Sequence, residues 1–281
     1  MIDFDNYRIE DLPKLTAEEE SRPYADYYYR GRLTPPAELL SATAPGHPLD
    51  PAQAIRLDNL ASLLKPDCPE PESGYCQLPE GGAYACTVIK MPGVDMNMVR
   101  WWIPWVLGDH LRYKIWHPGS HLEHYEGLAV EDIGGGMADI FLGDAYSDAE
   151  LGFPGKACDI NPVILAINSC KGRSRLHSDP ADSPKGRFSM VHMVRAIEGG
   201  IEYWSFAWCG LWLENGKVVN VIAPGETVTA ENGRHFASHL AHEYTTFARI
   251  LPELYAQYGK DPITPPMPWP ERVKPERSSG R

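Results

Sequence analysis

The segment RHFASHLAHEYTTFARILPELYAQYG, which runs from Arg234 to Gly259, decides the fold that this sequence predicts. Its apolar residues recur at intervals of three and four, which predicts one long amphipathic helix. On an ideal helix Phe236, Leu240, Phe247 and Leu251 share one face. Such a face needs an apolar surface to cover, so the helix is expected to pack on the main sheet of the protein.

Two polar residues interrupt this apolar face. Glu243 falls inside the apolar arc and His239 lies at its edge, one helical turn earlier. Burying a carboxylate costs several kcal/mol unless it is paired or bound to a cation. The i, i+4 spacing is also the usual way in which one helix supplies two ligands to one metal ion. Two alternatives stay open: Glu243 paired with an arginine beside a hydrogen-bonded core histidine, and a competing ligand pair of His235 with His239.

Composition limits the classes of protein that fit. The 281-residue chain is 43% hydrophobic and carries a formal net charge of -12, which disfavours nucleic acid or an anionic membrane as the main partner. No apolar run reaches the roughly 18 residues of a membrane span. The N-terminus lacks the order of a signal peptide, and the six cysteines form no CxxC pair. We therefore expect a cytoplasmic globular protein with buried thiols.

The middle of the chain predicts an α+β fold. Residues 81–91 read as a strand, residues 96–108 and 109–116 as two short helices, and the following segments as about six consecutive strands. Glycine turns at 198–200 and 214–217 separate strands and favour antiparallel hairpins. The simplest assembly is a curved antiparallel sheet wrapped on the C-terminal helix, with a cavity for an apolar ligand between them.

Three regions are expected along the chain. Residues 1–80 are rich in proline and acids and read as an arm of helices and loops, including a helix over 51–64, that packs on the main body or on a second subunit. Residues 81–260 would form the main domain, which contains the sheet and the last helix. Residues 261–281 form a proline-rich tail.

A second cluster of polar residues supports a metal site. The stretch LRYKIWHPGSHLEHYEG (111–127) holds Tyr113, His117, His121, His124 and Glu126 between a predicted helix and a strand. In the expected assembly this loop can face the start of the last helix. Nitrogen and carboxylate ligands without thiolate suit zinc, iron(II) or manganese(II), and zinc is favoured because nothing indicates redox chemistry.

At these residues the sequence resembles the 2,4-diacetylphloroglucinol hydrolase and phloretin hydrolase family, over roughly residues 85–258. The family pattern is a Tyr, a His eight residues later, a Glu about thirty residues on, and His-x-x-x-Glu on the last helix. The matching residues here are Tyr113, His121, Glu150, His239 and Glu243.

The resemblance implies a helix-grip (Bet v 1-like) domain, a zinc ion held by His121, Glu150, His239 and Glu243, and a homodimer formed through the N-terminal part. Asp148 or Glu126 are alternatives to Glu150 as the loop carboxylate.

The implied reaction is hydrolysis of the carbon–carbon bond between an acyl group and a phenolic ring. In that reaction the Tyr113 hydroxyl would stabilise an oxyanion, and His124 or His192 would protonate the ring carbon. His124 stands where the family pattern leads us to expect an asparagine-like residue, which leaves the substrate open.

Two other classes compete with this hydrolase. A non-catalytic helix-grip carrier of an apolar molecule would bind no metal, and the position of Glu243 speaks against it. A non-haem iron oxygenase of the cupin type is suggested by GSHLEHYEG, but its histidines are spaced HxxH rather than HxH. The sequence has no GxSxG elbow and no phosphate-binding glycine motif, which disfavours serine hydrolases and nucleotide-binding proteins.

Overall fold

The computed structural model describes residues 10, 12–65, 68–106, 109–125, 128–131, 139–141, 163–169, 188–214, 216–222 and 224–260. For residues 103–104, 122–125, 128–131, 139–141, 163–169 and 214 it describes the backbone only. Glu150 and the tail 261–281 therefore lie outside the described residues.

Short helices precede the first strand, and most of the regular structure follows it. In chain order the elements are α1 (Ala17–Glu20), α2 (Asp26–Tyr29), α3 (Ala37–Ala42), the 3-10 helices η2 (Pro51–Gln53) and η3 (Leu57–Leu64), β1 (Gly74–Gln77), β2 (Ala83–Pro92), α4 (Met96–Val106), α5 (His110–Trp116), β3 (His121–Tyr125), β4 (Leu128–Glu131), β5 (Asp139–Phe141), β6 (Val163–Ser169), β7 (Phe188–Ile197), β8 (Gly200–Cys209), β9 (Leu211–Glu214), β10 (Lys217–Asn220) and α7 (Ala230–Tyr258).

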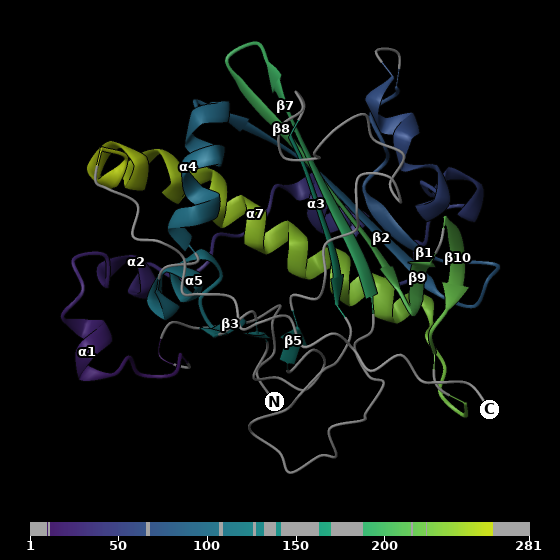
Figure 1. Cartoon of the computed structure of the whole chain (residues 1–281), viewed down its shortest axis with the longest axis horizontal. Helices are drawn as coiled ribbons and strands as arrows, with labels where there is room; N and C mark the ends of the chain where they lie inside the picture. Colours follow the sequence, from purple (N-terminus) through teal and green to yellow (C-terminus); the bar gives the residue numbers. More distant parts are fainter. Residues whose placement is uncertain are drawn as a thin grey trace.

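The described structure is α+β, as predicted, with an antiparallel main sheet. Five strands form that sheet in the order β1-β2-β8-β7-β6. The turn at Glu198 and Gly199 joins β7 to β8, with Ile197 opposite Gly200 and Gly199 at φ 74°. In Figure 1 the long helix α7 crosses the strands of this sheet diagonally.

The prediction that the consecutive strands form one sheet was wrong, because the described strands belong to separate sheets. Within the part of the chain that the structure describes, β3, β4 and β5 form a separate three-stranded sheet, and β9 pairs with β10 and not with the main sheet. Gly210 is one reason for the break after β8: its φ is +75°, and a Cβ atom there would lie 2.6 Å from the Ile222 side chain. A residue with positive φ ends a regular strand, so β9 leaves the main sheet.

Helix α7 lies close to the sheet because small residues line the contact. Ala83 and Ala85 of β2 are fully buried beneath it, together with Phe236, Leu240 and other apolar residues of α7. Gly233 is the point of closest approach, since a Cβ atom there would lie 2.5 Å from the carbonyl oxygen of Tyr84. The predicted helix is confirmed and begins four residues earlier than Arg234, at Ala230.

The N-terminal arm packs on the main body and covers both faces of the sheet. Leu57, Leu60 and Leu63 of η3 join Trp204 and Trp208 in a core on the face away from α7. The single helix expected over 51–64 was wrong. Two 3-10 stretches occupy it, and Asn59 (φ -134°, ψ 35°) interrupts the second.

The arm also contributes to the core on the α7 side. Tyr24 packs edge-on against Trp105 of α4, and Trp101 stacks on Trp105 with ring centroids 5.0 Å apart. The tryptophans of α4 therefore serve helix packing, as their pattern indicates. No helix among the described residues is long and apolar enough to cross a membrane.

Replacing Gly233 by alanine tests the close approach of α7. Alanine raises helix propensity, but its Cβ would meet the Tyr84 carbonyl, so we expect the free energy of unfolding to fall by about 2 kcal/mol. Urea denaturation measures the change. Ala256→Gly, at an exposed position of the same helix, is the control and should cost about 1 kcal/mol from propensity alone. A stabilised Gly233→Ala variant would contradict the tight contact.

Candidate metal centre

The turn between α5 and β3 brings two histidines to one place. Asp109 caps α5 by accepting a hydrogen bond from the Leu111 N–H at 2.8 Å. The helix ends at Trp116, and the His117 carbonyl then accepts bonds from the N–H groups of Ser120 and His121. Gly119 allows this tight turn with φ at 85°. His117 and His121 consequently stand one turn apart at the end of α5.

His121 is held by its tyrosine neighbour. Its Nδ1 lies 3.1 Å from the Tyr113 carbonyl oxygen, to which it donates, and the two rings stack in parallel with centroids 4.0 Å apart. With Nδ1 donating, Nε2 is the nitrogen that carries a lone pair. That Nε2 lies 3.8 Å from Glu243 Oε1.

Helix α7 supplies the facing half of the cluster. His239 Nδ1 lies 3.1 Å from Ser120 Oγ, and its Nε2 lies 3.4 Å from Glu243 Oε2. The Glu243 side chain is only 6% exposed. Its two carboxylate oxygens therefore each face one imidazole, which is the arrangement expected where a cation completes the site.

His117 completes a four-residue cluster. It is fully buried, its ring lies 4.6 Å from the His239 ring between centroids, and neither ring nitrogen has a hydrogen-bond partner among the described residues. Burial holds the pKa of His117 well below its usual value. Charge repulsion from nearby basic side chains, chiefly His239 and His121, is a smaller cause of this lowered pKa. A neutral imidazole with unused nitrogens is a suitable metal ligand.

One ligand atom from each of His117, His121, His239 and Glu243 can be chosen so that all lie within 4.8 Å of one another. The residues fit a divalent ion of the zinc, iron or manganese type, because three imidazoles and one carboxylate are offered without thiolate. The buried Glu243 carboxylate and the two His117 nitrogens without described hydrogen-bond partners also fit a bound metal ion. This cluster can hold a metal ion, and its composition does not fix which one.

The competing pair of His235 with His239 was wrong. The His235 side chain is 62% exposed and its Nε2 lies 3.0 Å from Glu231 Oε1, toward the solvent side of α7. His242 also stays outside the cluster of four and donates its Nδ1–H to the Ser238 carbonyl at 2.9 Å.

The predicted ligands and catalytic residues are only partly covered. His121, His239 and Glu243 come together as expected, whereas Glu150, Asp148 and Glu126 lie outside the described residues. His124 lies in β3 opposite Ala129, where the description covers the backbone only.

The sequence analysis did not single out His117 as a ligand. Its signal was the HPGSH pattern, in which a proline–glycine turn puts two histidines four residues apart at a helix end.

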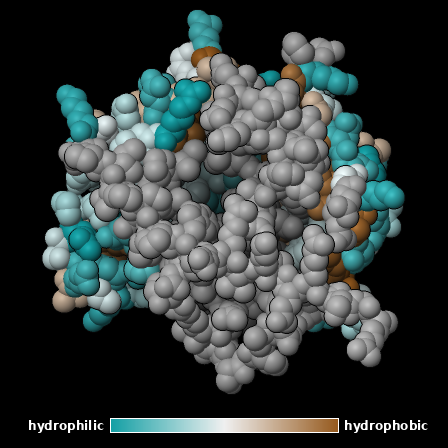
Figure 2. Space-filling view, viewed as in Figure 1, coloured by the Kyte–Doolittle hydropathy of each residue, from teal (hydrophilic) through white to brown (hydrophobic). Residues whose placement is uncertain are grey.

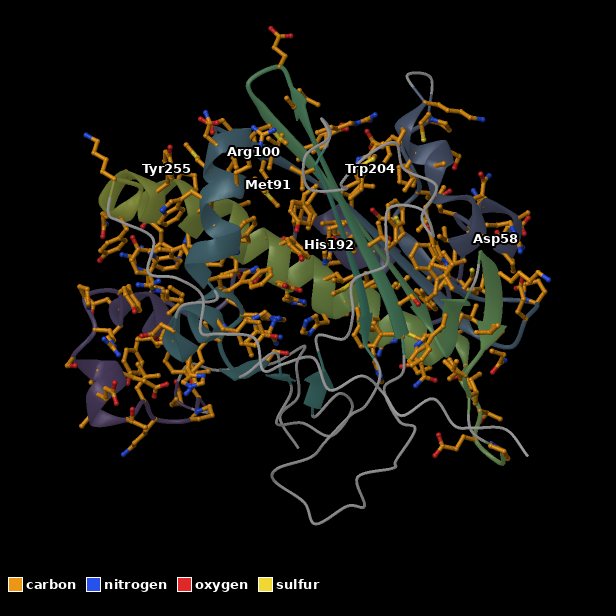
Figure 3. The ribbon with its side chains drawn as sticks, in the orientation of Figure 1. Asp58, Met91, Arg100, His192, Trp204 and Tyr255 are labelled. Atoms are coloured by element: carbon orange, nitrogen blue, oxygen red, sulfur yellow. The ribbon has the colours of Figure 1, made fainter. Side chains whose placement is uncertain are left out.

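Of the predicted catalytic residues, Tyr113 contacts the cluster directly through its stacking on His121. His192 lies on β7, between the sheet and α7, as Figure 3 shows. It is linked to the cluster through packed rings, since Tyr244 contacts both His192 and Trp116, and Trp116 contacts His121. Burial lowers the pKa of His192 to about 3, so its imidazole is neutral at neutral pH.

The fold and the cluster together describe an α+β domain with a buried group of side chains that can hold a metal ion, an arrangement that is common in metal-dependent enzymes. The family described as DAPG hydrolase PhiG domain matches residues 55–132 and 126–256. This covers most of the chain, and the chain belongs to that family.

Among related proteins, a phloretin hydrolase from Eubacterium ramulus is 29% identical over 257 residues, covering 85% of this chain and 92% of that protein. A 2,4-diacetylphloroglucinol hydrolase from Pseudomonas sp is 25% identical over 263 residues, covering 85% and 89%. The corresponding hydrolase from Pseudomonas protegens is 24% identical over 263 residues, covering 85% of each. The family identifies the chain as an enzyme of the hydrolase class.

The neutral state of His192 predicts a pH dependence of stability. Its folded-state pKa, about 3, lies below the unfolded value of about 6.5. Between these values the unfolded chain binds a proton that the folded chain does not, so stability falls as pH is lowered through this window. His192→Gln should reduce that slope by up to about 1.4 kcal/mol per pH unit. Urea unfolding of both proteins with a chelator between pH 4 and 7 measures it, and parallel curves would contradict a neutral buried His192.

Proposed function

We propose that this protein is a zinc-dependent hydrolase that cleaves the carbon–carbon bond between an acyl group and a phloroglucinol-like phenolic ring. The observation that carries the proposal is the buried cluster of His117, His121, His239 and Glu243 in a member of this hydrolase family. The relatives named for phloretin and 2,4-diacetylphloroglucinol supply the substrate class.

The metal would be held between α7 and the turn that follows α5. His239 and Glu243 would bind from the helix, with His121 and His117 facing them, and Glu150 remains our predicted loop carboxylate. Zinc bound there would supply Lewis acidity toward a ketone oxygen and would lower the pKa of water. Tyr113 and Ser120 would fix the orientations of His121 and His239 through their hydrogen bonds.

The overall reaction adds water across the acyl–ring bond. The water oxygen joins the acyl carbon, the acyl–ring bond breaks, and its electron pair passes to the ring carbon, which then takes up a proton. The ring hydroxyls make this leaving group tolerable because they spread its charge as an enolate. We propose that the Tyr113 hydroxyl stabilises charge on the acyl oxygen, and that His124 or His192 takes part in the proton transfer.

Two structural expectations belong to the same proposal. We assign the main sheet and α7 to the helix-grip (Bet v 1-like) class, with the region 81–260 as the catalytic domain. We also propose a homodimer formed through the N-terminal arm. Light scattering on the purified full chain would check the second expectation.

Metal content and hydrolysis, measured together, test the proposed function. We expect about one zinc per chain in wild type, its loss in His239→Ala and Glu243→Ala, and hydrolysis of phloretin or 2,4-diacetylphloroglucinol that falls at least about 100-fold in both variants. His235→Ala is the matched control, because His235 lies one turn earlier on α7 and faces solvent.

Folded wild type that binds no metal after zinc is supplied would refute the metal centre and leave a non-catalytic binder of apolar molecules. Activity restored by iron(II) or manganese(II) but not by zinc would refute the assigned metal. Retention of zinc without cleavage of either phenolic ketone would refute the substrate class.

Ser120→Ala should weaken metal binding without changing any ligand. Its hydroxyl lies at His239 Nδ1 and helps to orient Nε2 toward Glu243. Loss of such a supporting bond costs roughly 10-fold in metal affinity. Competition with a chromophoric chelator measures the affinity, with Ser62→Ala, in the remote 3-10 helix η3, as the control. Equal affinities in both variants would show that Ser120 does not support the centre.

A further inference from the structure

A second group of buried polar residues lies beneath α7, beside the metal cluster. Tyr203 and Ser205 of β8, His192 of β7 and Tyr244 of α7 are each no more than 4% exposed. We refer to these four residues as the tyrosine–histidine network. They sit where apolar side chains would pack, within the core on the α7 side of the sheet, and burying polar groups is tolerated when they bond one another.

Hydrogen bonds join the four residues in sequence. The Tyr203 hydroxyl donates to the Tyr244 oxygen at 3.4 Å, and the Tyr244 oxygen lies 3.1 Å from His192 Nε2. His192 Nδ1 in turn lies 3.0 Å from Ser205 Oγ. Because His192 and Ser205 are direct partners in the β7–β8 register, the sheet fixes that end. Tyr244 is the member of the network that comes from α7.

The Tyr244 oxygen also lies 3.5 Å from His192 Nδ1, so it contacts the imidazole beside both ring nitrogens. Ser205 Oγ contacts the same ring at Nδ1. A hydroxyl from α7 and a hydroxyl from the sheet therefore hold the orientation of this ring.

The network adjoins the metal cluster through two contacts. Tyr244 directly follows Glu243 on α7, and its ring packs on Trp116, which packs on His121. Tyr203 stacks on Tyr244 with ring centroids 4.2 Å apart. The negative charge of Glu243 contributes, after burial, to raising the pKa of Tyr203. Tyr203 thus lies at the end of the network nearer to the metal ligands.

We propose that Tyr244 is a positioning residue of this hydrolase: its hydroxyl holds the orientation of His192 and joins that histidine to Tyr203. His192 then takes part in proton transfer through the tyrosine hydroxyls. The expected effect of Tyr244 on catalysis rests on the proposed function. The contact between Tyr244 and His192 does not depend on it.

Tyr244→Phe tests the inference, because phenylalanine keeps the ring and removes only the hydroxyl. The matched control is Tyr75→Phe, another buried tyrosine, whose hydroxyl donates to the Ala44 carbonyl at 2.8 Å outside the network. Nitrogen-15 NMR of histidine-labelled protein reports the tautomer, with the His192 signals assigned by their absence from His192→Gln. Zinc content and kcat and KM for the phenolic ketone are measured on the same samples.

We expect the same neutral-imidazole signals for His192 in wild type and in Tyr75→Phe. Tyr244→Phe should shift or broaden these signals and lower kcat at least about 10-fold with little change in KM, while zinc stays bound. If Tyr244→Phe does not fold, Ser205→Ala tests the other end of the network and should shift the same signals.

Two results would overturn the inference: His192 ring-nitrogen signals unchanged by Tyr244→Phe, or an unchanged kcat in that variant. A wild type that cleaves no phenolic ketone would refute the proposed function and the catalytic part of this inference together. The NMR signals would still decide whether Tyr244 fixes His192.

Discussion

The buried carboxylate of Glu243 is the constraint around which the rest of the site is built. A carboxylate in the core is stable only where opposite charge or hydrogen-bond donors compensate it. Here two imidazoles face its oxygens at 3.4 and 3.8 Å, and a third histidine without described partners stands beside them. Burial favours the neutral form of His117, so this imidazole adds ligand nitrogen rather than compensating charge. The cluster can hold a metal ion, which would compensate this carboxylate.

The fold meets this constraint by placing α7 between the α5–β3 turn and the main sheet, each of which carries polar side chains that face the helix. Helix α7 can approach the sheet because Gly233 and the alanines of β2 leave room for it. Consecutive helical residues point about 100° apart. Glu243 therefore faces the α5–β3 turn, while Tyr244 faces His192 on the sheet. In the view of Figure 2 the described residues at the left margin are mostly hydrophilic.

The sequence predicted those parts of the structure that depend on local periodicity. The amphipathic pattern of 234–259 identified α7, and the i, i+4 spacing identified His239 and Glu243 as a pair. It did not predict the division into three sheets, because strand pairing depends on contacts between distant segments and on a single glycine backbone at Gly210. His117 was missed for a similar reason. A histidine just after a helix takes its direction from the turn that follows, and that turn depends on the φ of Gly119.

Two of the buried histidines, His117 and His192, show how the environment gives different chemical roles to identical side chains. His117 and His192 are both kept neutral by burial, yet His117 has no described hydrogen-bond partner and His192 has a hydroxyl at each nitrogen. Nitrogens without protein partners are suited to a ligand that the chain does not supply, whereas nitrogens already bonded can only pass protons along existing bonds. On one side of α7 the histidine nitrogens are arranged so that they can hold a metal ion, and on the other side they are in contact with hydroxyls. What separates the roles is the hydrogen-bond partners that the fold places around each ring.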